Sequence, residues 1–321
     1  MADTAAAART SGERIHFQIF EGRAAPVDPV PTAVVCPYDD VSLSGALQAA
    51  DKELIVPLLV GHRETIEFAA GKIGRSLHGI EIVEASDDAE AAGAAVSLVH
   101  EHRARCLMKG HLHTDTFLHP IVSRSGGLRA GRRLSHVFVM DLPYHPAPLL
   151  ITDAAINIAP DLATKADIVK NGIDLAVSLG IERPKVAILS AVETVNEAIP
   201  SSVDAAILAK MSDRGQIKGG IVDGPFAMDN AIDAQAAKTK DLHSPVAGQA
   251  EVLVVPSIEA GNILFKGLTF LGGAESAGLV MGASVPIMLT SRADDDRARV
   301  ASASLALLYD HWCKTHGPLG D

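Results

Sequence analysis

Short runs of β-branched and aliphatic residues recur along this chain with helical stretches between them, and that alternation leaves few fold classes open. Strands that alternate with helices indicate βαβ units and a mostly parallel sheet. The expected strands are Thr32–Cys36, Leu54–Val60, Ile80–Val83, Cys106–Met108, His136–Asp141, Leu149–Thr152, Lys185–Ser190, Gly220–Asp223, Val252–Val255 and Val285–Thr290. Together they approach the upper limit of one open twisted sheet, about 10 strands, so an α/β protein of two domains is predicted.

The composition of the chain excludes several classes of protein. The 28 basic and 39 acidic side chains give a formal net charge of −11, which argues against a general nucleic-acid binder because phosphate contacts need a basic face. Hydrophobic residues make up 48% and charged residues 21% of the chain, so a disordered protein is excluded. The three cysteines are far apart and outside any CxxC pair, which indicates small buried thiols rather than a disulfide framework or a zinc ribbon.

No membrane or export signal is visible. The longest apolar window, Ala277–Leu289, contains Ser284 and Pro286 and is too short for a membrane span, which needs about 20 apolar residues. Residues 1–14 are rich in alanine and lack the basic start and apolar core of a secretory signal. We therefore expect a cytoplasmic protein.

Two helices are clear from periodicity. The first covers about Leu162–Leu179, with Thr164 and Asp167 at the spacing of a capping box. The last covers roughly Ala293–Trp312, with an apolar stripe at helical spacing that indicates a core helix.

Ligands of open α/β sheets bind beyond the carboxyl ends of strands, so the residues that follow each strand are the candidate site residues. The last strand leads into Ser291, Arg292 and Asp294 at the start of the final helix. A guanidinium and helix N–H groups could hold an anion. Ser291 and Asp294 also have the spacing of a capping box, which explains these two residues without a ligand but leaves Arg292 unexplained.

A second candidate follows the strand Cys106–Met108. Lys109 before Gly110 suits an anion contact, because glycine lets a ligand approach the backbone. His111 and His113 also form a His-x-His pair, which could bind a transition metal together with Asp115 or His119. That spacing alone is a weak signal, and with 13 histidines in the chain the preferred interpretation is surface histidines, or histidines behind a ligand, near a turn.

Two further strand ends could line the same site. They are Asp223-Gly224-Pro225, with Asp229-Asn230 beyond it, and Glu259-Ala260-Gly261-Asn262, with Lys266 beyond it. Each is also an ordinary loop or helix-cap sequence. The chain has no GxGxxG after a strand, no GxxxxGK[ST] and no GxSxG, which argues against dinucleotide binding, nucleotide triphosphate binding and a nucleophile elbow.

Five segments together resemble the phosphate acetyltransferase and phosphate butyryltransferase family. They are LMKGHLHTD at 107–115, ITDAAINIAPDL at 151–162, KMSDRGQIKGGIVDGPFAMDNAI at 210–232, PVAGQAEVLVVPSIEAGNILFKGL at 245–268 and VMGASVPIMLTSRADDD at 280–296. The chain looks most similar to the branch related to bifunctional enoyl-CoA hydratase/phosphate acetyltransferases. Only about thirty residues precede the first expected strand, so the hydratase domain and its activity are not expected.

The resemblance implies a fold like that of isocitrate and isopropylmalate dehydrogenases: two αβα three-layer domains with mostly parallel sheets and an active site in the interdomain cleft. It implies a discontinuous first domain of residues 1–141 and 290–321, and a second domain of residues 142–289. It also implies a homodimer that acts on acyl-CoA, phosphate and acyl phosphate, with coenzyme A and phosphate as substrates and no tightly bound cofactor or metal.

Carried over by position, the resemblance implies that Ser291 bonds the reacting carbonyl or phosphate, Arg292 neutralises phosphate charge and Asp294 takes the thiol proton. The segment SRADDD leaves Asp295 and Asp296 as other choices of base, and resembles the butyryl type more than the acetyl type. The expected substrate-binding residues are Lys109, Gly110, Thr114, Arg214, Asn262 and Lys266. His119 stands where the family commonly has an arginine that contacts phosphate or coenzyme A. Arg214 or Lys109 could compensate for the missing arginine.

Two rival functions stay open at this point. One is a metal-dependent hydrolase built on His111, His113 and Asp115. The other is a non-catalytic protein of the same fold that binds coenzyme A, which His119 and the shifted acidic residues suggest. The leading prediction is a reversible short-chain phosphate acyltransferase that works by direct transfer in a ternary complex.

Overall fold

The computed structural model describes residues 15–289 and 296–317. It divides into two compact units. The first unit comprises Phe17–Arg132 and the described residues from Ala277 onward, and the second comprises Arg133–Ser276 together with the described residues up to His16. The domain boundaries expected from the sequence, after Asp141 and Leu289, lie downstream of these breaks, and that domain assignment stays a prediction.

The first unit contains a mostly parallel sheet of strand order β3-β2-β1-β4-β11-β10. Its strands are β1 (Val30–Val35), β2 (Ile55–Gly61), β3 (Glu81–Glu84), β4 (Cys106–Lys109), β10 (Glu275–Met281) and β11 (Ile287–Met288). Strand β4 pairs in parallel with β1 on one side and with β11 on the other, and only β10 runs antiparallel to its neighbour β11. Both β1 and β4 are almost entirely buried, as expected for strands covered on both faces.

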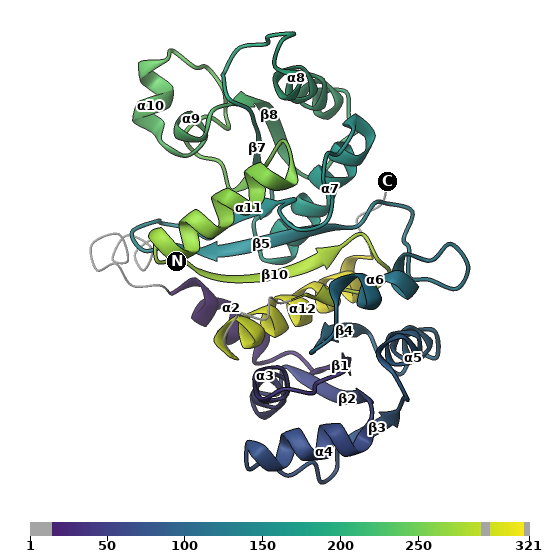
Figure 1. The fold of residues 1–321 in the computed structure, drawn as a ribbon. Coiled ribbons are helices and arrows are strands. Elements are labelled where there is room, and N and C mark those ends of the chain that lie inside the picture. Colours follow the sequence, from purple (N-terminus) through teal and green to yellow (C-terminus); the bar gives the residue numbers. More distant parts are fainter. Residues whose placement is uncertain (1–14, 290–295, 318–321) are drawn as a thin grey trace. The chain divides into compact units, whose positions relative to one another are not determined.

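The helices of this unit are α2 (His16–Ala24), α3 (Asp40–Asp51), α4 (Arg63–Lys72), α5 (Asp88–His100), α6 (Thr114–Val122) and α12 (Asp296–His316). The chain moves from β1 through α3 to β2 and through α4 to β3, and α5 then returns it past β1 to β4 (Figure 1). Because parallel crossovers are right-handed, α3 and α4 cover one face and α5 the other. The direction of progression thus reverses between β1 and β4, which makes this pair the topological switch point of the sheet.

The second unit contains strands in the order β5-β6-β9-β7-β8. They are β5 (Ser135–Asp141), β6 (Leu149–Thr152), β7 (Lys185–Leu189), β8 (Ile221–Phe226) and β9 (Val252–Val254). Strands β6, β9, β7 and β8 are parallel, while β5 is antiparallel to β6. The sheet is therefore mostly parallel, as predicted.

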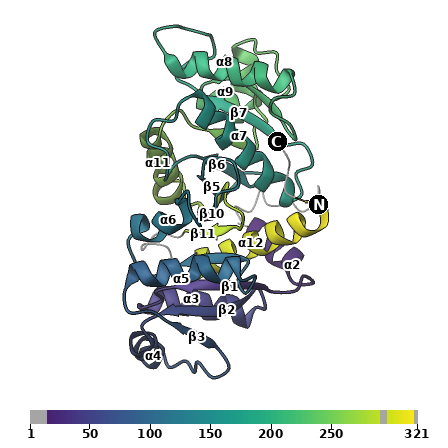
Figure 2. The same cartoon turned by 90° about the vertical axis from the view of Figure 1, so that its right-hand side faces the viewer.

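Helices cover both faces of the second unit's sheet (Figure 2). They are α7 (Leu162–Ser178), α8 (Pro200–Asp213), α9 (Met228–Ile232), α10 (Ala234–Thr239) and α11 (Ile258–Lys266), which runs into a π-helical turn at Gly267–Leu271. Alternate strand residues point to opposite faces: Thr152 and Val252 meet α7 at Gly172, whereas Ile151 and Leu253 join a core with residues of α9, α10 and α11. The unit is thus a three-layer αβα structure.

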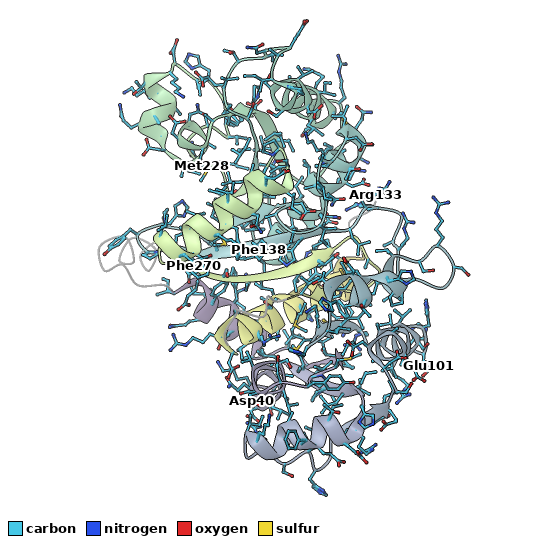
Figure 3. All side chains as sticks on the ribbon, viewed as in Figure 1. Asp40, Glu101, Arg133, Phe138, Met228 and Phe270 are labelled. Carbon is cyan, nitrogen blue, oxygen red and sulfur yellow. The ribbon has the colours of Figure 1, made fainter. Side chains whose placement is uncertain are left out.

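The core on the α11 face includes an aromatic pair. Phe138 of β5, labelled in Figure 3, stacks on Phe265 of α11 with ring centroids 3.9 Å apart. Met228 of α9 packs against the same core. These contacts fix α11 on the sheet and so determine where its polar face lies.

Two details differ from the predictions. Strand β10 was not expected; it covers seven residues from Glu275 and is separated from β11 by a stretch that contains Gly282, Ser284 and Pro286. Helix α7 begins as expected, but its N-cap is Asp161, which accepts a hydrogen bond from the Thr164 backbone N–H at 2.8 Å. The predicted capping box of Thr164 and Asp167 is therefore wrong; Asp167 accepts instead from the Arg133 backbone N–H. None of the described helices is long and apolar enough to cross a membrane.

Candidate active site

The switch point of the first unit brings two loops together. After β1 the chain continues as Cys36-Pro37-Tyr38-Asp39, and after β4 as Gly110-His111. The Gly110 N–H donates to the Val35 carbonyl at 2.8 Å and the His111 N–H donates to the Cys36 carbonyl at 2.7 Å. A Cβ at residue 110 would lie 2.4 Å from the Cys36 oxygen, so only glycine allows this approach.

Two cationic side chains are buried beneath this turn. Lys109 is 4% exposed, and its Nζ donates to the Gly110 carbonyl at 3.3 Å. Arg299 of α12 is 3% exposed, and its Nη1 donates to the Lys109 carbonyl at 3.5 Å. Arg299 reaches this position across Gly45 of α3, where a Cβ would lie 2.4 Å from its Cδ. Two positive charges, Lys109 in the turn and Arg299 from α12, are therefore buried at the turn that was predicted to contact an anion.

A histidine and an aspartate form a pair at the mouth of the same turn. His111 Nδ1 lies 2.7 Å from Asp39 Oδ2. Asp39 is also the N-cap of α3, where Oδ1 accepts from the Ser42 backbone N–H at 2.7 Å. Burial raises the pKa of Asp39, but hydrogen bonds from Ser42 and the contact with His111 lower it by more than burial raises it. The pKa of Asp39 therefore lies below its ordinary value. Asp39 is thus held ionised as an acceptor for the imidazole.

Helix α6 carries the remaining candidates from this segment. Thr114, a predicted substrate-binding residue, is its first residue and is half-buried. His113 precedes it without a side-chain cap bond, and Asp115 and His119 are exposed. Among the described residues, no three His, Cys, Asp or Glu side chains are grouped so that they could hold a metal ion. Nothing supports the hydrolase alternative, since His111 is engaged with Asp39 instead.

The predicted catalytic residues Ser291, Arg292 and Asp294 lie outside the described residues, as does Asp295. On the amino-terminal side, β11 ends at Met288, the partner of Met108 in β4. On the other side, Asp296 begins α12.

The Asp296 carboxylate has two partners on α3. Its Oδ2 accepts from Ser44 Oγ at 2.9 Å and from Gln48 Nε2 at 2.6 Å. The third of the three predicted acids is therefore engaged in packing α12 onto α3.

In the second unit a buried carboxylate organises the loop after β6. Asp153 is 2% exposed, and its Oδ1 accepts from the backbone N–H groups of His136, Ala155 and Ile156 at 3.2, 3.0 and 3.1 Å. Its Oδ2 accepts from the backbone N–H and side-chain Nδ2 of Asn157 at 2.9 and 2.6 Å. Five donors converge on one side chain, which fixes the path of residues 153–157.

Helix α11 rests on this loop. Gly261 permits the contact, because a Cβ there would lie 2.9 Å from the Cα of Ala154. Asn262 Nδ2 donates to the Ala154 carbonyl at 3.5 Å. Lys266, four residues later, shares the helix face of Asn262 and is exposed. The structure thus brings two of the predicted substrate-binding residues onto one face, next to a rigid loop.

Arg214 lies elsewhere in the second unit. It is the exposed C-cap residue of α8, the helix that connects the carboxyl end of β7 to the amino end of β8. Helix α11 starts beyond the carboxyl end of β9, whereas Arg214 lies before the amino end of β8. Because β8 and β9 belong to the same set of parallel strands, the two positions are at opposite ends of these strands.

The remaining candidate does not follow its strand as expected, because Asp223-Gly224-Pro225 lie inside β8, and the polar residues beyond this strand form an ionic cluster. Lys240 Nζ lies 3.2 Å from Glu193 Oε2 and 3.4 Å from Asp229 Oδ2. The buried Asn230 donates to the same Glu193 oxygen at 3.5 Å. These contacts connect neighbouring loops of the second unit and explain the polar residues without a ligand.

The prediction of buried thiols is confirmed for Cys36 and Cys106 and wrong for Cys313, which is partly exposed. Cys36 and Cys106 are poor nucleophiles. Burial raises the pKa of the Cys36 thiol to about 12 and also raises that of Cys106. A thiol with such a pKa stays protonated at neutral pH and is unreactive.

Comparison with known proteins identifies the family. A family model described as phosphate acetyl/butaryl transferase matches residues 89–307. The chain belongs to the phosphate acetyl/butyryl transferase family. The resemblance seen in the sequence is thereby confirmed.

Similar members of the phosphate acetyl/butyryl transferase family include a phosphate acetyltransferase from Rhizobium meliloti, 54% identical over 88% of this chain and 89% of that protein. A phosphate butyryltransferase from Clostridium beijerinckii is 42% identical over 87% of this chain and 93% of that protein. The crystal structure of a branched-chain phosphotransacylase from Enterococcus faecalis has a TM-score of 0.76 at 32% identity, covering 88% of this chain and 99% of that one. The predicted α/β fold class is therefore confirmed.

Sequence reasoning missed the partners of three residues that shape these loops: Asp39, Asp153 and Arg299. Asp39 precedes an apolar helix and has a readable cap signal, but its partner His111 is 72 positions away. Asp153 stands at an expected strand end, yet four of its five donors follow it in a loop with no regular pattern. Arg299 lies within a helix and had no signal that distinguishes it from a surface residue.

Proposed function

We propose that this chain is a phosphate acyltransferase that reversibly converts acyl-CoA and phosphate into acyl phosphate and CoA, for acyl groups from acetyl to butyryl. The observation that carries the proposal is the 54% identity, over 88% of the chain, to a relative named phosphate acetyltransferase. A relative named phosphate butyryltransferase at 42% identity supports the wider acyl range.

The proposed reaction is direct transfer within a ternary complex, which needs orientation rather than a covalent enzyme intermediate. In the direction of acyl-CoA synthesis, Asp294 takes the thiol proton, the sulfur attacks the acyl carbon and phosphate leaves. Ser291 bonds the reacting carbonyl or phosphate and Arg292 neutralises phosphate charge. The bonds from Ser44 and Gln48 to Asp296 favour one of the two preceding acids as the base.

The proposed substrate contacts belong to both units. In the first, Lys109 and Gly110 belong to the turn after β4 and Thr114 begins α6, and the buried cation of Lys109 suits a phosphate group. In the second, Asn262 and Lys266 share one face of α11. Arg214 stays a proposed contact, although it lies at the amino end of the parallel strands and α11 follows their carboxyl end. The proposal includes a cytoplasmic homodimer with no tightly bound cofactor.

Thiol release from acetyl-, propionyl- and butyryl-CoA, measured with and without phosphate on a metal-free preparation, tests the proposal. Phosphate-dependent release is expected, and its relative rate ranks the acyl groups. Release that is independent of phosphate indicates a thioesterase, and no release with any donor leaves a protein that only binds coenzyme A; either result refutes the proposal.

Variants test the assigned roles. Arg292→Ala is expected to raise the KM for phosphate and lower kcat, and Asp294→Asn to lower mainly kcat. The exposed Arg183 gives a matched control, since Arg183→Ala removes the same charge from a turn before β7. If Asp294→Asn leaves kcat unchanged and Asp294→Ala lowers stability by about 1 kcal/mol without lowering kcat, the residue is a helix cap and not the base.

A further inference from the structure

Direct acyl transfer creates a requirement at the phosphate that a thiol base does not meet; this inference rests on the proposed function. When the sulfur bonds the acyl carbon, the bond from that carbon to the phosphate oxygen breaks and the oxygen keeps the electron pair. An acyl phosphate dianion then expels a phosphate trianion, a strongly basic leaving group, unless a proton reaches the departing oxygen. A proton-transfer group beside the phosphate would supply this proton at the departing oxygen.

The pair of His111 and Asp39 has the geometry of such a group. An ionised carboxylate only accepts hydrogen bonds, so the 2.7 Å contact requires a proton on His111 Nδ1. The ring orientation is thus fixed, and the other nitrogen, Nε2, is directed away from Asp39. Nε2 makes no hydrogen bond to any described residue, and the His111 side chain is 49% exposed.

The location supports a ligand at this histidine. Asp39 follows β1 and His111 follows β4, and these two strands flank the switch point, beyond whose carboxyl ends ligands of α/β sheets bind. Lys109 and Gly110, the proposed phosphate contacts, immediately precede His111. Asp39 Oδ1 is held by the Ser42 N–H at 2.7 Å, so the carboxylate that orients the ring is itself fixed to α3.

We propose that His111 Nε2 is the proton donor to the departing phosphate oxygen, and that Asp39 is the positioning residue that orients it. The donor is the imidazolium form of His111, which carries a proton on Nε2 as well as on Nδ1. In acyl-CoA synthesis the thiol proton passes to the carboxylate base, the carbon–sulfur bond forms, the carbon–oxygen bond breaks and the Nε2 proton moves to phosphate, which leaves a neutral ring whose Nδ1–H still bonds Asp39. The products are acyl-CoA and hydrogenphosphate. In the reverse direction His111 takes that proton from hydrogenphosphate as the acyl phosphate forms.

A change of leaving group tests the proposal directly. His111→Gln is expected to lower kcat/KM for acetyl phosphate about 100-fold, the usual contribution of a general acid. Methyl acetyl phosphate expels methyl phosphate, a monoester with a second pKa of about 6 that leaves as a stable dianion without protonation. The variant is therefore expected to equal the wild type within about threefold on this substrate.

The matched control is His78→Gln. His78 is an exposed histidine in the turn before β3, the edge strand of the same sheet, and therefore lies at the amino end of the strands and not at the carboxyl end where His111 lies. It is expected to behave as the wild type on both substrates. Equal losses in His111→Gln on acetyl phosphate and methyl acetyl phosphate indicate a binding or structural role and overturn the proposal, as does full activity of the variant on acetyl phosphate.

Asp39→Asn isolates the positioning role. Asparagine caps a helix as well as aspartate does, so the bond from Ser42 and the stability of α3 should be kept, while the acceptor for Nδ1–H is lost. The variant is expected to lose kcat on acetyl phosphate with an unchanged thermal midpoint, and to lose nothing further in combination with His111→Gln. Additive losses in the double variant refute the coupling. An inactive wild type refutes the proposed function, whereas an active wild type with unaffected variants refutes only the role of His111.

Discussion

Replacing Asp153 by asparagine changes one oxygen into an NH2 group inside a buried network of five donors. The asparagine oxygen can replace Oδ1 and keep the three backbone donors of His136, Ala155 and Ile156. The new NH2 group then faces the two donors of Asn157 that Oδ2 accepted at 2.9 and 2.6 Å. Two N–H groups lose their acceptor and meet another donor.

The magnitude follows from these two groups. A buried donor left without an acceptor costs about 1–3 kcal/mol, so with two such donors the variant is expected to lose about 2–6 kcal/mol of unfolding free energy. Asp161→Asn is the matched control, because Asp161 is an exposed N-cap and asparagine caps equally well. The control should unfold like the wild type.

Urea denaturation followed by far-UV circular dichroism measures both variants. A lower midpoint at an unchanged m-value is the expected signature of Asp153→Asn. Since Ala154 carries the carbonyl to which Asn262 donates, the variant should also raise the KM for substrate. A loss below about 1 kcal/mol means that the donors find other partners, and it refutes the argument that Asp153 holds the loop.

Three further predictions concern the first unit. Gly110→Ala places a Cβ 2.5 Å from the Val35 carbonyl oxygen and is expected to cost about 3 kcal/mol in urea denaturation and to reduce turnover; wild-type stability contradicts the close approach. Because the Cys36 pKa is raised from 9.0 to about 12, the folded state holds a proton that the unfolded state releases above pH 9, so unfolding free energy should fall as pH rises from 9 toward 12. Cys36→Ala should make that decline shallower in pH-dependent denaturation, and an identical slope disproves the assignment. Asp296→Ala removes bonds from Ser44 and Gln48 and is expected to cost about 1–2 kcal/mol, again by urea denaturation, whereas a marked loss of kcat at unchanged stability makes Asp296 the base.

Much of the fold was readable from local pattern. The strands at Leu149–Thr152 and Cys106–Lys109 and the helix that starts at Leu162 lie where periodicity predicted them, to within a residue. The strand β10 was missed even though Gly282, Ser284 and Pro286 mark a break between it and β11. The capping box of α7 was misread because aspartate and threonine both cap helices, so the residue types at 161 and 164 do not show which of them starts the helix.

Some features of the candidate site could likewise be predicted from the sequence, and others could not. The sequence by itself determined the α/β class, the family and the strand-end positions of Lys109, Gly110 and Asn262, because these depend on local patterns and on segments that match as continuous strings. Only the tertiary structure decided that Asp39 meets His111, that Arg299 reaches the Lys109 carbonyl and that Asp296 bonds to α3. Each of these contacts joins residues 72 to 252 positions apart, brought together by strand order and helix packing. No periodicity encodes such pairs, since the distance between two side chains in space is set by the sheet and not by their separation along the chain.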